Sequence, residues 1–235
     1  MKIIIGNWKM NGDAELLDEM MKNLAEINTE NRVILCVPAT LLRPGTGAVM
    51  IGAQNVSKYE SGAHTGDISA ALVSATGAST TLVGHSECRA VQHDTNADVA
   101  KRAELGLKSD LMPIICIGET AEEHNAGETH KIIEQGVRES IPSNATNGSF
   151  IIAYEPRWAI GTGMTPTMDE IAENHKIIRK ILNEMGFDET PILYGGSVTA
   201  TNAKEIMSVE NVDGVLVGGA SLKKDDFIPI ITSVK

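Results

Sequence analysis

Short runs of apolar residues recur eight times along the chain, and they are nearly continuous rather than alternating with polar residues. They cover residues 3–5, 33–37, 50–53, 81–83, 113–117, 150–154, 191–194 and 212–217. A continuous run of this length is typical of a strand with both faces buried, as in a parallel sheet. Glycine or polar residues follow each run, so eight buried strands are predicted.

Longer segments with helical periodicity lie between these runs. They cover residues 13–27, 94–105, 129–141, 167–185 and 200–207. In the first segment Leu17, Met20 and Leu24 fall on one stripe, and Asp13 stands where it would cap the helix start. In the fourth, Thr167 and Glu170 have the spacing of a capping box.

Eight alternations of strand and helix predict an α/β fold, a single (β/α)8 TIM barrel formed by residues 1–235. A doubly wound open sheet is the alternative. One interval is too short for the pattern, since only residues 39–49 separate the second and third strands, which is near the lower limit for a parallel crossover. Pro44 and Gly45 within it oppose helix formation, so the second helix is expected to be truncated or missing.

The charge balance narrows the classes of partner. The chain has 20 Lys and Arg against 31 Asp and Glu, a formal net charge of −11, whereas nucleic-acid-binding domains are normally basic. A nucleic acid is therefore not expected as a partner. A small anionic substrate stays compatible, because a pocket of an acidic protein can be locally positive.

The three cysteines form no Cys-x-x-Cys pair, and their odd number suits a reducing compartment. The first residues show no signal-peptide core, and no apolar run approaches the roughly 20 residues that span a bilayer. A cytoplasmic protein without a membrane partner is expected. The six histidines show no metal-ligand spacing, so neither a metal nor a cofactor is predicted.

Polar residues that follow the strands are the candidates for chemistry, because functional groups of such barrels lie at the carboxyl ends of the strands. Asn7 and Lys9 follow the first run, His85 the fourth and Glu155 the sixth. A cation, an imidazole and a carboxylate are thus expected to converge at one end of the barrel.

Three glycine clusters follow the last three runs, at residues 161–163, 195–196 and 218–219. Glycine allows backbone N–H groups to approach an anion closely, and the loops after strands seven and eight are the common phosphate site of this fold. A phosphate-bearing substrate is predicted.

Six segments resemble the triosephosphate isomerase family and occur in the family's order. They are NWKMN at residues 7–11, VGHSE at 83–87, AYEP at 153–156, IGTG at 160–163, YGGSV at 194–198 and VGGASL at 217–222. The resemblance implies interconversion of dihydroxyacetone phosphate and D-glyceraldehyde 3-phosphate through an enediolate, in glycolysis and gluconeogenesis.

The resemblance also implies roles for single residues. Glu155 is similar to the base, His85 to a neutral electrophile, Lys9 to the cation beside the substrate and Asn7 to a group that orients the substrate oxygen. The family is itself a standard example of such a carboxylate–imidazole pair.

Supporting residues follow from the same resemblance. Ile160 and Leu216 would press on the carboxylate, Glu87 would pair with Lys9, and Cys116 would pack near the base, although a simple core thiol explains Cys116 almost as well.

A lid is implied for residues 156–165, and its closure would exclude water and protect the enediolate. Tyr194 and Ser197 would hold the lid closed. Backbone N–H groups of Gly161, Ser197, Gly218 and Gly219 would hold the phosphate.

Residues 61–66 are similar to a loop that enters a neighbouring subunit, which implies a homodimer with Thr65 and His64 at the interface. His64 stands where the family has an aromatic residue, Arg157 replaces a small apolar residue in the first hinge of the lid, and Met164 replaces a lysine in the second. The shortened second crossover is expected to expose apolar surface, which would permit a larger oligomer.

Two other functions fit the strand-end residues. One is another phosphosugar enzyme, such as an aldolase that forms a Schiff base on Lys9. The other is a barrel that binds a sugar phosphate without converting it.

Overall fold

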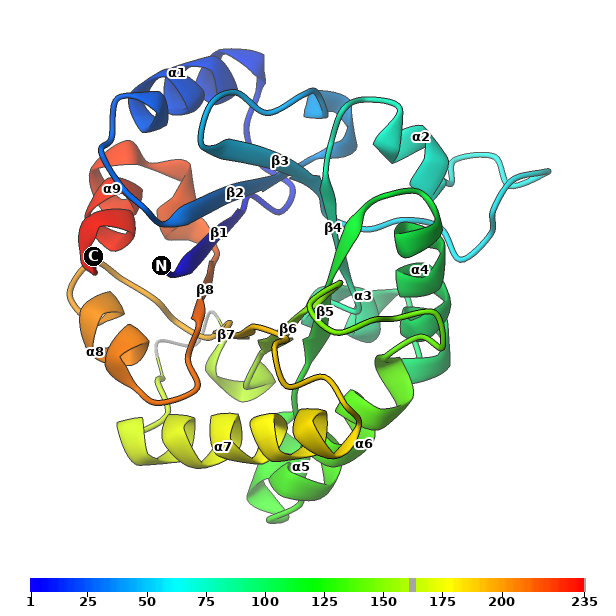
Figure 1. Ribbon diagram of the computed structural model, residues 1–235, viewed down its shortest axis with the longest axis vertical. Coiled ribbons are helices and arrows are strands. Elements are labelled where there is room, and N and C mark those ends of the chain that lie inside the picture. The colour runs from blue at the N-terminus through cyan, green and yellow to red at the C-terminus, as the bar shows by residue number, and fades with distance from the viewer. Residues whose placement is uncertain (161–163, 235) are drawn as a thin grey trace.

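Eight parallel strands close into a barrel, and helices surround it (Figure 1). This computed structural model describes residues 1–160 and 164–234. The strands are β1 (Ile3–Asn7), β2 (Arg32–Val37), β3 (Val49–Ala53), β4 (Thr80–Val83), β5 (Met112–Ile117), β6 (Ile151–Tyr154), β7 (Ile192–Tyr194) and β8 (Gly214–Val217). Each strand pairs with its neighbour in sequence, and β8 pairs with β1, so the predicted barrel is confirmed and the open sheet is wrong.

The helices follow the strands on the outside of the barrel. They are α1 (Ala14–Ala25), α2 (Ala70–Ser74), α3 (Ser86–Val91), α4 (Asn96–Lys108), α5 (Ala121–Asn125), α6 (Thr129–Ser140), α7 (Met168–Glu184), α8 (Ala203–Ser208) and α9 (Lys224–Thr232), with 3-10 turns η1 (Ala39–Leu41), η2 (Arg157–Ala159) and η3 (Gly219–Leu222). The two predicted caps are present: Asp13 Oδ1 accepts the Leu16 amide at 2.8 Å, and Thr167 and Glu170 form a capping box. The helix expected from residue 200 begins later, at Ala203.

Two apolar layers share the strands, as their continuous hydrophobic runs predict. One layer contains Ile5, Ile34 and Cys116, and the other contains Ile4, Leu35 and Ile117 together with the helices. Successive residues of a strand point to opposite faces, so the first layer fills the barrel and the second joins barrel to helices. Apolar side chains on both faces therefore fix the strand positions.

The crossover between β2 and β3 contains only the three-residue turn η1, which confirms the missing second helix. The prediction that the short crossover exposes apolar surface is wrong for β2 and β3, because Leu35 and Ile51 on these strands remain buried. Leu41 and Leu42 from the crossover are partly buried against the same layer. The short connection thus covers the strands in place of a helix.

Candidate active site

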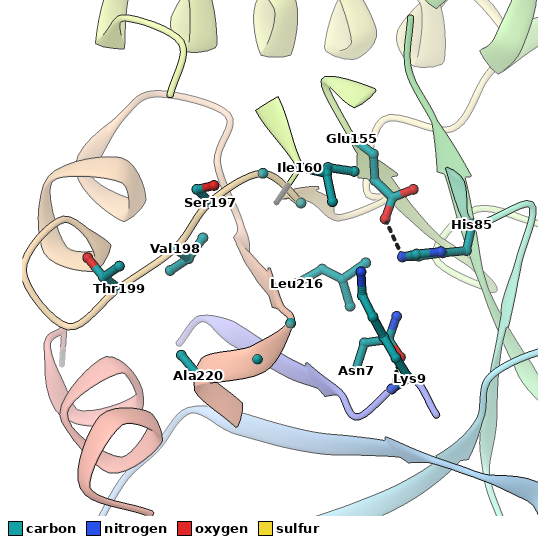
Figure 2. Close-up of a pocket in the computed structure, with 14 residues that line it drawn as sticks. Asn7, Lys9, His85, Glu155, Ile160, Ser197, Val198, Thr199, Leu216 and Ala220 are labelled. Atoms are coloured by element: carbon teal, nitrogen blue, oxygen red, sulfur yellow. Dashed lines mark hydrogen bonds and ion pairs between the residues drawn. The ribbon is translucent and has the colours of Figure 1, made fainter. Parts of the chain in front are cut away.

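A cavity of about 310 Å³ opens at the carboxyl ends of the strands (Figure 2). Nine of the predicted site residues line it: Asn7, Lys9, His85, Glu155, Ile160, Ser197, Leu216, Gly218 and Gly219. Gly195, Gly196, Val198, Thr199 and Ala220 complete the lining. Residues far apart in sequence therefore meet because each follows, or ends, a strand of the same barrel.

The Glu155 carboxylate faces the His85 ring across this cavity (Figure 2). Glu155 Oε1 lies 3.1 Å from His85 Nε2, and Glu155 Oε2 accepts the Ser86 amide at 2.8 Å. Only 2% of Glu155 and 6% of His85 are exposed. Burial of a carboxylate is costly unless hydrogen bonds compensate it, and two donors from the β4–α3 junction supply this compensation.

The local backbone determines the protonation of the His85 ring. His85 is the N-cap of α3, and its Nδ1 accepts the Glu87 amide at 3.2 Å. An Nδ1 that accepts an amide proton carries none itself, so the proton of the neutral ring is on Nε2, where it is donated to Glu155.

Lys9 is held by its backbone as well as by its side chain. Its backbone is left-handed, with φ of 52°. Its amide donates to Asn7 Oδ1 at 3.0 Å, and its carbonyl accepts from Gln54 Nε2 at 2.7 Å. Lys9 Nζ lies 2.6 Å from Glu87 Oε1, so the predicted pair of these two residues forms. These contacts keep the ammonium group at the cavity beside Asn7.

Apolar residues lie around the carboxylate. Leu216 is 3% exposed and lines the cavity with Ile160 (Figure 2). Cys116 is fully buried, and burial raises its pKa well above the usual range, with the Glu155 charge acting in the same direction. A thiol with a raised pKa stays protonated, which is the state of a core thiol rather than of a nucleophile.

The opposite side of the cavity consists of the loops that follow β7 and β8. Ser197, Gly218 and Gly219 are there, whereas Gly161 lies outside the described residues. Ser197 Oγ donates to the Ala159 carbonyl in the predicted lid at 3.0 Å. The buried Tyr194 hydroxyl has no hydrogen-bond partner in the described ranges 1–160 and 164–234. One predicted lid contact is therefore present in these ranges.

Two residues near the site lack an assigned role in the sequence analysis. Glu119 follows β5, is buried, and accepts hydrogen bonds from Tyr154 Oη at 3.1 Å and Trp158 Nε1 at 2.8 Å. Burial raises the Glu119 pKa. Gln54 fixes the Lys9 carbonyl. Both residues follow strands, so the position after a buried strand, which identified Glu155, could have identified them as well.

The predicted interface loop projects from the barrel next to α2 (Figure 1). Thr65 and His64 are exposed on it, and the His64 ring stacks on Tyr59 with 3.8 Å between the ring centroids. Neither residue reaches the cavity of its own chain.

The fold and the site together define a TIM-barrel enzyme in which a buried carboxylate, an imidazole and an ammonium group meet at a glycine-lined cavity. A profile of the triosephosphate isomerase family matches residues 2–234. The chain belongs to the triosephosphate isomerase family.

Individual relatives agree with this assignment. The triosephosphate isomerase of Rhizobium meliloti (strain 1021) is 44% identical over 97% of this chain and 94% of its own length. The triosephosphate isomerase of Jannaschia sp. (strain CCS1) is 45% identical over 99% of this chain and 98% of its own length. A crystal structure of triosephosphate isomerase from Bartonella henselae superposes with a TM-score of 0.89 at 36% identity, covering 99% of this chain and 98% of that one. The predicted family and enzyme class, an isomerase, are confirmed, and the aldolase and the non-catalytic barrel are not supported.

Proposed function

We propose that Glu155 carries the proton between the two carbons when this protein interconverts dihydroxyacetone phosphate and D-glyceraldehyde 3-phosphate. This interconversion is the isomerase reaction of its family, a step of glycolysis and gluconeogenesis. The 3.1 Å contact between Glu155 and the protonated nitrogen of His85 is the observation that most supports the proposal. It brings a proton acceptor and a hydrogen-bond donor to one cavity, as transfer between neighbouring carbons requires.

In the proposed reaction the substrate enters between these two side chains. Its carbonyl oxygen replaces Glu155 as the acceptor of the His85 Nε2 proton, which frees the carboxylate to remove a proton from the adjacent carbon. Negative charge then develops on the substrate oxygens. His85, Lys9 and Asn7 stabilise this charge, because donors that are already oriented need no reorganisation during the reaction.

The phosphate group would lie on the opposite side of the cavity. Backbone amides of Ser197, Gly218, Gly219 and Gly161 are proposed to bind it, with Lys9 adding positive charge. The Ser197 contact with Ala159 supports a role of Ser197, with Tyr194, in holding the lid over the bound substrate. Glu87 is proposed to position Lys9, and Ile160 and Leu216 to exclude water from Glu155.

Replacement of the base tests this assignment. The variant Glu155→Gln keeps the size of the side chain but removes its proton acceptor, so kcat should fall by about 10³-fold or more while KM changes far less. The control variant Glu173→Gln removes an exposed carboxylate of α7 and should leave kcat unchanged. A kcat for Glu155→Gln within tenfold of the original value would contradict the proposal.

We also propose a single-domain protein that acts as a cytoplasmic homodimer. The exposed loop with His64 and Thr65 supports the dimer, because it projects from the barrel and leaves both side chains exposed. None of the described helices has the length and apolarity needed to cross a membrane. Sedimentation should give twice the chain mass of 25.1 kDa, and Thr65→Asp should lower it toward one chain. An active protein that sediments as a monomer would contradict the proposed dimer.

A further inference from the structure

A second polar cavity, of about 160 Å³, lies outside the catalytic cavity near the ends of β5 and β6. Its lining includes Arg89, Arg157, Asn96, Gln135 and Glu123. These residues come from α3, η2, α4, α6 and α5. The four helices among these elements lie on the β5 and β6 side of the barrel in Figure 1. Arg157 belongs to the first hinge of the predicted lid, and the mechanism described above gives no role to the other four residues.

Arg89 contributes a partly buried positive charge that neutral groups solvate. Its Nε donates to the Gly84 carbonyl at 2.8 Å and one terminal nitrogen donates to Asn96 Oδ1 at 2.8 Å. The other terminal nitrogen donates to the Cys116 carbonyl at 3.1 Å and to Ser140 Oγ at 3.4 Å. In residues 1–160 and 164–234 no carboxylate forms an ion pair with it. A guanidinium has five N–H donors, and these contacts leave at least one available for an anion.

Arg157 adds a second positive charge to the same cavity. Its amide donates to the Glu119 carbonyl at 3.0 Å, and no ion pair of its side chain occurs within the described ranges. Burial lowers the pKa of Arg89, and the charge of Arg157 acts in the same direction. Both guanidinium groups line the same cavity, so their like charges repel, and an anion between them would reduce that repulsion.

The acidic residues nearby do not neutralise this pair. Glu123 lines the cavity, but its Oε2 accepts the Thr120 amide at 2.7 Å as part of the α5 capping box. Glu139, outside the lining, accepts from Asn96 Nδ2 at 2.9 Å and from Gln135 Nε2 at 3.1 Å. Both carboxylates lie beyond ion-pair distance of the two arginines.

We propose that this cavity binds a small oxyanion, namely a phosphate group, between Arg89 and Arg157. Two guanidinium groups with free N–H donors suit the oxygens of phosphate. The cavity has the volume of about five water molecules, which is enough for the five heavy atoms of a phosphate ion. The source is either inorganic phosphate or the phosphate of a small metabolite. Arg157 lies two residues after Glu155, and Arg89 lies one helical turn after His85, so the anion would connect the segments that carry both side chains.

Phosphate binding can be measured with the catalytic phosphate site blocked. A Cβ added to Gly219 meets no atom within 4 Å, so Gly219→Asp places a negative charge in that site without a clash. Equilibrium dialysis with labelled inorganic phosphate should then find one phosphate per chain. Adding Arg157→Gln should weaken this binding at least tenfold, whereas Arg157→Lys should retain part of it.

The matched control is Arg179→Gln in the same background, which removes one positive charge from a site where Asp213 already pairs with it. It should leave phosphate binding unchanged. Competition with 3-phosphoglycerate distinguishes the sources: tighter binding that depends on Arg157 indicates a phosphorylated metabolite, and no gain over phosphate indicates the inorganic ion. Absence of phosphate from Gly219→Asp, or equal binding after Arg157→Gln, would overturn the proposal.

Discussion

His85 and His175 occupy two different regions of the barrel, and both rings are buried. His85 lies at the carboxyl ends of the strands, with Nδ1 accepting an amide and Nε2 directed at Glu155. His175 lies on α7 under the helical layer, near the rings of Tyr154 and Tyr194. Its Nδ1 is 3.0 Å from the Asn211 carbonyl, and Nε2 has no hydrogen-bond partner in the described residues.

The comparison shows that burial alone does not make a histidine functional. A neutral ring that contacts a carbonyl through Nδ1 donates there, so His175 has its proton on the nitrogen opposite to that of His85. Burial lowers the His175 pKa to about 4, which keeps the ring neutral. His85 differs because its protonated nitrogen faces a carboxylate and an open cavity. The two rings therefore differ in the group that accepts their proton and in whether a substrate can reach them.

The largest expected difference is in turnover. His85→Gln removes the proposed donor to the substrate oxygen and should lower kcat by about 10²- to 10³-fold. His175→Gln, the matched substitution in the other region, should leave kcat within about twofold for the folded protein. A steady-state assay of both variants measures this, and equal losses would show that the comparison is wrong.

A smaller effect is expected in stability against pH. The folded pKa of His175, about 4, lies below the ordinary value of 6.5, so the unfolded chain binds more protons between these values. The resulting stabilisation is complete above pH 6.5 and decreases as the pH falls toward 4, by at most about 3 kcal/mol.

Chemical denaturation between pH 7.5 and 4 measures this change. The wild-type free energy of unfolding should fall more steeply with acid than that of His175→Gln, which lacks the titrating group. Parallel pH profiles would show that His175 is not held neutral by the fold.

The smallest effect concerns the residue that positions the His175 acceptor. Asn211 has a left-handed backbone with φ of 65°. Asn211→Ala should reduce the free energy of unfolding by about 1 kcal/mol, because the short polar side chain of Asn favours the left-handed region and that of Ala does not. Asn211→Gly should change it less, because glycine adopts this region without a steric cost. Thermal unfolding of both variants measures the difference, and kcat should be unchanged. An equal cost for Ala and Gly would contradict the backbone explanation.

Much of the barrel follows from local patterns in the sequence. The eight continuous apolar runs identify the strands, because each strand is buried on both faces, and Pro44 with Gly45 explains the missing helix. The short helices α3 and α5 have too few turns to show periodicity. Helix α9 contains Pro229, which normally argues against a helix interior.

The strand-end rule brings together Asn7, Lys9, His85 and Glu155, and the structure places all four at one cavity. The same rule does not separate Glu155 from Glu119, since each follows a buried strand. Their difference depends on neighbours distant in sequence: Glu119 is occupied by Tyr154 and Trp158, whereas Glu155 faces His85. The tautomers of His85 and His175 also depend on tertiary contacts that the sequence does not display.

The central claim is that the Glu155 carboxylate moves the substrate proton. Deuterium incorporation into dihydroxyacetone phosphate in D₂O, followed by NMR for the wild type and Glu155→Gln, measures proton removal directly. We predict rapid incorporation at the carbon that bears the hydroxyl group with the wild type and a loss of about 10³-fold or more with the variant. Incorporation at the wild-type rate by Glu155→Gln would contradict the claim.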